Sequence, residues 1–325
     1  LVEIADVILP RVDGPHFTFV DPRKHDDMIS MIRNARRLVS LFEEKHISKR
    51  KIVVSIPATF EGIRAAQVLE SEHAIHTNLY LVSSLLHAAA CAEAGATTIT
   101  VPVGRLLDWY ERRRRTDFKD LSIHPGTESI QASIQYFKLH GIKTKVIGSE
   151  FRSLSEIVPL TGLDAICISK DQADGLKGCQ ISVSISSATS SSPAALLRAR
   201  QALYPTKLLS AHSGFMDTMS TETRTMITEI LYGSLRELKC HLDELQSLMA
   251  RELADQYNSR TLDLKSLYKA RNERPHRMKK GTKVSSSGDL ETKNMLPGWS
   301  LEEDRARPEE VHWTACGFHD IDDVF

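Results

Sequence analysis

The sequence predicts an α/β fold built on a parallel sheet, either one (β/α)8 barrel or two ordinary domains, and three observations support this prediction. Short segments with β-strand character alternate with amphipathic helical stretches across residues 14–170. Such alternation is typical of parallel strands joined by crossover helices. At 325 residues the chain is long enough for one barrel or two ordinary domains. The segment Lys51–Thr59, followed by a helical stretch at Phe60–Glu70, is the clearest β/α unit.

The other elements can be placed in order along the chain. His16–Val20 alternates as a strand does, and the helix expected over Lys24–Lys45 carries an apolar stripe at helical spacing. Further strands are expected at 77–82, 97–101, 143–148 and 165–169, and further helices at 83–94, 106–115, 124–140 and 153–160. Gly95 and Gly141 are expected to end two of these helices, Gly95 in left-handed backbone.

The C-terminal part of the chain differs in composition from the rest. Met219–Leu253 predicts a long helix whose leucines and isoleucines recur every three or four residues. Residues 271–325 are polar and charged with few aliphatic residues, which predicts a disordered tail. We therefore expect a barrel domain over residues 1–255, with the C-terminal helix at 219–253, and a charged tail beyond it. The stripe on the helix would also suit the seam of a homodimer.

Three stretches resemble the transaldolase family: Ser55–Glu70, Ile75–Tyr110 and Ile142–Ile157. The resemblance implies a class I aldolase-type (β/α)8 barrel in which a lysine forms a Schiff base with a ketose phosphate. It also implies that Leu1–Pro10 is the helix before the third strand, so that the first two strands and the family's aspartate on the first strand are missing. Either the chain is a fragment or truncated product, or its C-terminal half fills the gap.

By this resemblance the machinery of the Schiff base is replaced. Ser55 stands at the position of the lysine, and a hydroxyl cannot form an imine. Phe19 stands at the position of the family's glutamate and Tyr80 at that of a threonine, while Asn78 matches an active-site asparagine. Aldol cleavage through an imine needs a neutral amine together with a general acid and base. We therefore expect a protein of pentose phosphate type ancestry without transaldolase activity.

Two arginines match the family's phosphate-binding positions. Arg105 and Arg152 each follow the C-terminal end of an expected strand, and a guanidinium group can donate two parallel hydrogen bonds to a phosphate. We expect them to bind a phosphorylated sugar. The alternative is that each pairs with a nearby carboxylate, for instance Glu150 or Asp108.

Two other functions stay open. A repurposed barrel enzyme, acting as a lyase, isomerase or cyclase, would use Glu150, Lys170 or Tyr80 in place of the lost groups. Lys170 follows the last expected strand and could reach over the barrel mouth, or it is a solvated loop lysine; Lys145 is expected to face the helices. A dimerising interaction module, using the helix at 219–253, is the third interpretation.

Composition narrows the partners and the location. The 42 basic and 42 acidic residues cancel, which argues against nucleic acid as a partner, and we interpret the run Arg112–Arg115 as the last turn of a helix. Five cysteines without metal-ligand spacing suggest reduced thiols and a cytoplasmic location. No stretch approaches the roughly 18 apolar residues of a membrane helix. We expect no metal and no cofactor, because the histidines show no ligand motif.

Overall fold

A computed structural model describes residues 2–116, 118–160, 162–178, 192–204, 206–210 and 215–272, with side chains as far as Tyr257. The described residues fall into two units, one ending at Leu245 and one beginning at Gln246. Each unit is described by itself. The tail expected over 271–325 lies outside the described residues from position 273 onward.

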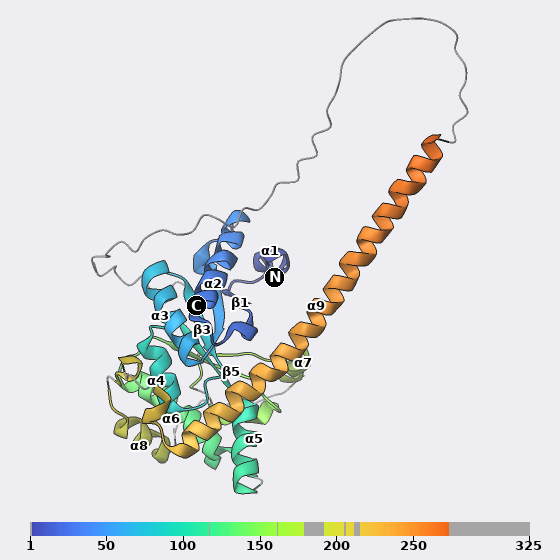
Figure 1. Cartoon of the computed structure of the whole chain (residues 1–325). Coiled ribbons are helices and arrows are strands. Elements are labelled where there is room, and N and C mark those ends of the chain that lie inside the picture. Colours follow the sequence, from blue (N-terminus) through green and yellow to red (C-terminus); the bar gives the residue numbers. More distant parts are fainter. Residues whose placement is uncertain are drawn as a thin grey trace, which may run out of the picture. The chain divides into compact units, whose positions relative to one another are not determined.

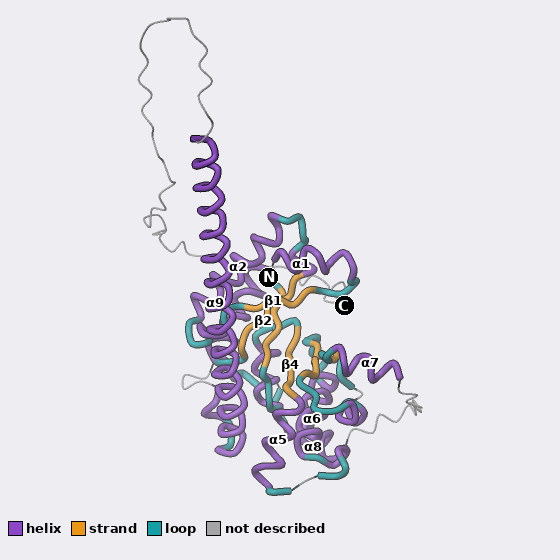
Figure 2. Tube along the Cα trace, turned by 90° about the vertical axis from the view of Figure 1, so that its right-hand side faces the viewer, coloured by secondary structure: helices purple, strands orange, loops and turns teal. Residues whose placement is uncertain are grey.

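The first unit is built on one parallel sheet. Its strands are β1 (His16–Phe19), β2 (Ile52–Pro57), β3 (His76–Tyr80), β4 (Thr98–Pro102), β5 (Lys145–Ser149) and β6 (Ala165–Ile166). They lie side by side in the order of the sequence, and every neighbouring pair is parallel. Figure 2 shows these strands, in orange, as a curved sheet. The expected α/β architecture is confirmed, and the sheet corresponds to part of a barrel wall.

The helices that connect β1 to β5 lie where the sequence predicts them, whereas those at 170–178 and 193–201, after the last strand, were not predicted. Figure 1 shows the described helices. They are α1 (Val2–Ile8), α2 (Met28–Glu44), α3 (Phe60–His73), α4 (Leu85–Glu93), α5 (Val103–Arg114), α6 (Pro125–Leu139), α7 (Lys170–Gly178), α8 (Pro193–Gln201) and α9 (Thr221–Asn272). Gly95 and Gly141 have φ angles of +76° and +62°, in agreement with their predicted role after helix ends. Among the described residues, no helix is both long and apolar enough to cross a membrane.

Three elements differ from the sequence prediction for local reasons. The helix expected from Lys24 begins instead at Met28, because the Asp27 side chain accepts a hydrogen bond from the Ser30 backbone and caps α2 there. The helix expected over 153–160 is two 3-10 turns, at Leu154–Glu156 and Val158–Leu160. Pro159 lies in the second turn and has no backbone N–H for a continuous helix. β6 has two residues instead of five, and no strand follows it in the described part of the chain.

The core lies between the sheet and the helices that cover it. Every residue of β2 is buried, which explains why its sequence is almost continuously apolar. The predicted stripe of α2 is confirmed, because Met31, Ala35, Val39 and Phe42 all point into this core. The first half of α9 closes the unit with Ile227, Leu231 and Leu235, each at most 4% exposed.

A buried glutamate ties α3 to the beginnings of two strands. Glu70 Oε1 accepts hydrogen bonds from the backbone N–H and hydroxyl of Thr77, at 2.6 Å each, and of Thr97, at 2.9 Å each. Burial raises the pKa of Glu70 to about 7, and the four hydrogen bonds only partly oppose that shift. Because Thr77 bonds to a helix, its side chain lies on the helix-covered face, and the side chain of its neighbour Asn78 lies on the other face.

Replacing Glu70 by glutamine should flatten the dependence of stability on pH. The folded-state pKa of about 7 lies above the ordinary value of 4.5, so the native protein binds a proton that the unfolded chain releases between these values. The stability gained from that proton is present below about pH 4.5 and is lost as the pH rises through 7, by about 3 kcal/mol in all. Urea unfolding between pH 5 and 8 should show this loss in the wild type and much less of it in Glu70→Gln. Glu72→Gln, at an exposed glutamate of the same helix, is the control and should behave as the wild type does.

Candidate functional site

Parallel pairing places four predicted site positions in one row or beside it. Phe19 is the register partner of Ser55, Ser55 of Asn78, and Asn78 of Thr98. Register partners point to the same face of a sheet, so these side chains share the face that α3 does not cover. We call this the inner face. Tyr80, two residues beyond Asn78, lies on the same face nearer the C-terminal ends of the strands, which we call the mouth.

Ser55 belongs to a buried hydrogen-bond chain. The Asn78 side-chain amide donates to Ser55 Oγ at 3.2 Å, and the Asn78 carbonyl oxygen accepts from the hydroxyls of Thr98 and Thr100 at 2.9 and 2.8 Å. Ser55 and Asn78 are only 1% and 5% exposed. Neither a histidine nor a carboxylate bonds to Ser55 in the described structure, so nothing there activates its hydroxyl as a nucleophile. The arrangement can donate and accept hydrogen bonds, and it holds no amine.

Two aromatic side chains flank this chain of polar groups. The rings of Phe19 and Tyr80 meet edge to face with centroids 6.2 Å apart. Phe19 is 52% exposed, whereas Tyr80 is 9% exposed. Burial raises the pKa of the Tyr80 phenol, and the Asp21 carboxylate raises it further. Tyr80 therefore stays protonated at neutral pH and can act as a hydrogen-bond donor there, but not as a base.

Arg105 lies between two carboxylates at the mouth. It is in the first turn of α5, and its Nε donates to Glu150 Oε2 in the loop after β5. Its Nη2 donates at 2.8 Å to Glu237 Oε2 of α9. The hydrogen bond from Arg105 holds the pKa of Glu237 below its usual range. Of the two predicted outcomes for this arginine, the pairing with Glu150 is thus observed.

Arg152 is bound by three carboxylates. Its Nε donates to Glu156 at 2.5 Å, and its terminal nitrogens donate to Asp108 at 2.5 Å and to Glu111 at 2.8 and 3.1 Å. The Arg152 backbone N–H also donates to Glu156, whose side chain is 2% exposed. These contacts join α5 to the turn after β5. The pairing with Asp108, which the sequence offered as the alternative to phosphate binding, is thus observed.

A glycine brings the two arginines together. A Cβ atom at Gly104 would lie 2.4 Å from the Glu150 carbonyl oxygen and 2.8 Å from Arg152 Cγ. The absence of a side chain therefore lets the start of α5 approach the loop after β5, where the Gly104 N–H donates to the Glu150 carbonyl at 3.1 Å. Arg105 follows Gly104 directly and pairs with the side chain of Glu150 in the same loop.

Lys170, which the sequence raised as a substitute amine, and Lys145, which it set aside, both lie away from Ser55. Lys170 is exposed at the first residue of α7 and makes no hydrogen bond or ion pair within the described structure. The expectation that Lys145 faces the helices is wrong. Lys145 is the register partner of Thr98, so it lies on the inner face, but at the first residue of β5, far from the mouth. Its Nζ is 3.7 Å from Asp164 Oδ1.

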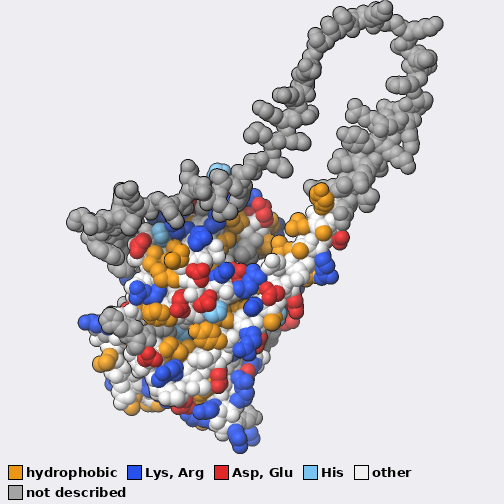
Figure 3. All heavy atoms as spheres, viewed as in Figure 1, with side chains coloured by type: hydrophobic (Ala, Val, Ile, Leu, Met, Phe, Trp, Pro, Cys, Tyr) orange, Lys and Arg blue, Asp and Glu red, His pale blue; other side chains and the backbone are white. Residues whose placement is uncertain are grey.

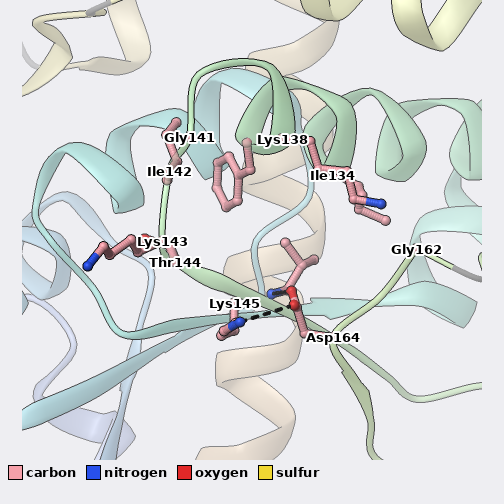
Figure 4. A pocket seen from close by; sticks show the side chains of 11 residues that line it. Ile134, Lys138, Gly141, Ile142, Lys143, Thr144, Lys145, Gly162 and Asp164 are labelled. Carbon is pink, nitrogen blue, oxygen red and sulfur yellow. Dashed lines mark hydrogen bonds and ion pairs between the residues drawn. The ribbon is translucent and has the colours of Figure 1, made fainter. Parts of the chain in front are cut away.

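A pocket of about 280 Å³ opens at this opposite end of β5, under the end of α6 (Figure 4). Its lining includes Ile134, Phe137, Lys138, Ile142, Lys143, Lys145, Val146 and Asp164. Figure 4 shows Lys143 pointing away from the pocket and Lys145 directed towards Asp164. The pocket contains no predicted site residue.

The surface charges are mixed, as the composition predicts. On the face shown in Figure 3, basic and acidic side chains of the described residues are interspersed. Arg112, Arg113 and Arg114 occupy the last turn of α5, which confirms the structural interpretation of the arginine run. Among the described residues, no three histidine, cysteine or acidic side chains are grouped as a metal site would require.

Sequence reasoning missed three of the acidic partners. Glu156 could have been found, because it lies four residues after Arg152 and is a natural short-range partner. Glu111 faces Arg152 across 41 positions, and Glu237 faces Arg105 across 132 positions. No local pattern identifies pairs at such separations.

The fold and the inner-face row define a protein of the (β/α)-barrel class with its polar groups towards the C-terminal ends of the strands. Residues 1–219 match the family model described as transaldolase/fructose-6-phosphate aldolase, and the chain belongs to this family. It is similar to transaldolase of Saccharomyces cerevisiae, with 42% identity over 176 residues, which are 54% of this chain and 52% of the relative. It is also similar to a probable transaldolase of Dictyostelium discoideum, with 38% identity over 182 residues, 56% of this chain and 55% of the relative.

A bacterial relative matches over more of the chain. Transaldolase of Methylococcus capsulatus is 34% identical over 247 residues, which are 76% of this chain and 72% of the relative. By contrast, the chain spans about half the length of the yeast and Dictyostelium relatives. The expected family is thereby confirmed.

Substituting alanine for Gly104 should destabilise the protein, because the new methyl group would overlap the Glu150 carbonyl oxygen. Overpacking of this kind costs about 1–3 kcal/mol. Chemical unfolding measures the loss. Gly233→Ala is the matched control, since a Cβ there meets nothing within 4 Å and alanine favours the helix by up to about 1 kcal/mol. Equal stability of Gly104→Ala and the wild type would contradict the close approach.

Proposed function

We propose that this chain is a transaldolase-family protein of carbohydrate metabolism that has lost Schiff-base catalysis and binds a phosphorylated sugar without cleaving it. The observation that carries the proposal is Ser55. By resemblance it stands at the position of the imine-forming lysine, and among the described residues its buried hydroxyl bonds only to Asn78. A hydroxyl can hydrogen-bond to a sugar, but it cannot replace a carbonyl oxygen with a C=N bond.

The neighbouring substitutions support the same proposal. Proton transfer during aldol cleavage requires a group that can both accept and release a proton near neutral pH. Phe19 has no such group, and the pKa of Tyr80 is raised by burial. On the inner face around Ser55, the polar side chains of Ser55, Asn78, Thr98 and Thr100 bind each other. These groups can recognise hydroxyls more readily than they can move protons.

Arg105 is the better candidate of the two arginines for a phosphate group. Its side chain is 36% exposed at the mouth, and its hydrogen bonds go to two carboxylates that are themselves 41% and 57% exposed. Arg152 instead neutralises Glu156, which has almost no contact with solvent. Removing Arg152 would leave that carboxylate buried without its cation, so its main contribution is to stability.

A first test of the proposal is reductive trapping. We expect no stable adduct when the protein is treated with borohydride in the presence of fructose 6-phosphate, because no amine stands at the Ser55 position. Mass spectrometry of the intact protein makes the measurement, and a lysine-bearing transaldolase treated alongside shows that trapping works. An adduct mapped to Lys145 or Lys170 would overturn the loss of catalysis.

A second test addresses binding. Fructose 6-phosphate should raise the melting temperature of the wild type, since a ligand that binds only the folded state stabilises it. Arg105→Ala should remove this shift, whereas Arg113→Ala, at an exposed arginine of the same helix, should retain it. The absence of a shift in the wild type at millimolar ligand would count against sugar-phosphate binding.

The repurposed enzyme gains no comparable support. Glu150 is engaged by Arg105, Lys170 is exposed on α7 without a partner in the described structure, and Tyr80 stays protonated at neutral pH. The three groups therefore do not form an acid, base and nucleophile in hydrogen-bond reach of each other.

Self-association has a specific observation in its favour. In the second unit, α9 exposes Leu248, Met249, Leu253 and Tyr257, with exposed fractions between 53% and 72%. A stripe of this kind on a helix otherwise lined by polar residues favours a second copy of the same helix. The dimer seam expected over 219–253 is thereby shortened at its N-terminal end. Ile227, Leu231 and Leu235 are buried within the first unit and cannot contact a second copy.

Charged substitutions on the stripe should separate the dimer. The double variant Leu248→Glu and Leu253→Glu should sediment as a monomer at concentrations where the wild type is a dimer. Ala250→Glu with Ala254→Glu adds the same charge beside the stripe and should remain dimeric. A wild type that sediments as a monomer at micromolar concentration would dismiss this second function.

A further inference from the structure

Two carboxylates already occupy the guanidinium N–H groups of Arg105 that a bound anion would need. Glu150 reaches it from the loop after β5 and Glu237 from α9, so the two carboxylates come from elements 87 positions apart in the sequence (237 minus 150). Each accepts one N–H of the guanidinium, on Nε and on Nη2. A phosphate group bound to this arginine would need the same donors.

The backbone holds Glu150 in this position. Its φ angle is +54°, a left-handed conformation that glutamate adopts rarely and at some cost in free energy. The Gly104 N–H donates to its carbonyl oxygen at 3.1 Å, one residue before Arg105. The side chain therefore leaves the loop directly beside the first turn of α5. An unusual backbone conformation that aims a carboxylate at a cation calls for a functional explanation.

The charges around Arg105 do not suit an added dianion. One guanidinium faces two carboxylates, and the adjacent Arg152 faces three more, from Asp108, Glu111 and Glu156. A phosphate dianion that entered without displacing Glu150 or Glu237 would meet two negative charges within a few ångströms. Both carboxylates are partly exposed, at 41% and 57%, so either can turn into solvent.

We propose that Glu150 and Glu237 determine the specificity of this site, acting as internal carboxylates that compete with the phosphate group of a ligand for Arg105. The inference rests on the proposed sugar-phosphate binding and deepens it. A phosphorylated sugar therefore binds the wild-type site, but less tightly than it would bind an Arg105 free of both carboxylates. Anion binding also competes with the contact between α9 and Arg105, because Glu237 must release the guanidinium.

Calorimetric titration of the full chain with inorganic phosphate, fructose 6-phosphate and fructose tests this. The variants are Glu150→Asn, which removes the charge while tolerating left-handed backbone, Glu237→Gln on the surface of α9, and the two combined. We expect the double variant to bind inorganic phosphate and fructose 6-phosphate at least tenfold more tightly than the wild type, and each single variant to show part of the gain. Affinity for fructose should not change, because it carries no phosphate. Glu244→Gln, at an exposed glutamate of α9 outside the site, should bind as the wild type does.

The outcomes separate this inference from the function on which it rests. If the wild type and the double variant bind fructose 6-phosphate with equal affinity, the carboxylates do not compete and the inference is overturned, while the proposed function stands. If neither protein binds any phosphate, both are overturned. Should Glu150→Asn unfold at a lower temperature than the wild type, Glu237→Gln alone must still tighten phosphate binding, and its failure to do so overturns the part assigned to Glu237.

Discussion

The register of the parallel sheet is the constraint on which the candidate site depends. The successive pairing of β1 with β2, β2 with β3 and β3 with β4 aligns Phe19, Ser55, Asn78 and Thr98. The hydrogen bond between Thr77 and Glu70 fixes which face of the sheet this row occupies. A slip of one residue in β3 would turn Asn78 towards α3 and bury an unpaired amide in an apolar core, at a cost of several kcal/mol. The register thus allows Asn78 to bond to its three neighbours. These hydrogen bonds in turn favour this register over any other.

The mouth is organised by charge in a different way. Arg152 satisfies Glu156 in a dry environment and ties α5 to the turn after β5, so it has little freedom to bind anything else. Arg105 is held by partners that remain in contact with water, and ion pairs of this kind contribute little net stability. Arg105 can therefore release its carboxylate partners to bind another anion, whereas Arg152 cannot release Glu156 without leaving it buried and unpaired.

Local patterns in the sequence were sufficient for the strands and most helices, because each β/α unit carries its own apolar periodicity. The family resemblance, and not a local pattern, located Ser55, Asn78, Arg105 and Arg152 near the inner face or the mouth. Local patterns failed where a distant element decides the result. The face of Lys145 depends on how β5 pairs with β4, and the partner of Arg105 on where α9 packs. Neither the face of a strand residue nor a distant ion-pair partner can be predicted from a window of a few residues.

The proposed loss of the amine and the presence of the two carboxylates are physically connected. In an imine-forming barrel, a phosphate anchor holds the substrate while its carbonyl carbon meets the amine, so strong anchoring contributes to the rate through positioning. Under the proposed function the position of the amine holds the buried Ser55 hydroxyl bonded to Asn78, and tight anchoring would then accelerate no reaction. A carboxylate such as Glu150 can then occupy the guanidinium without a catalytic penalty. The same ion pair holds the loop after β5 against α5. Arg105 then contributes to the internal structure and has a lower affinity for an external anion.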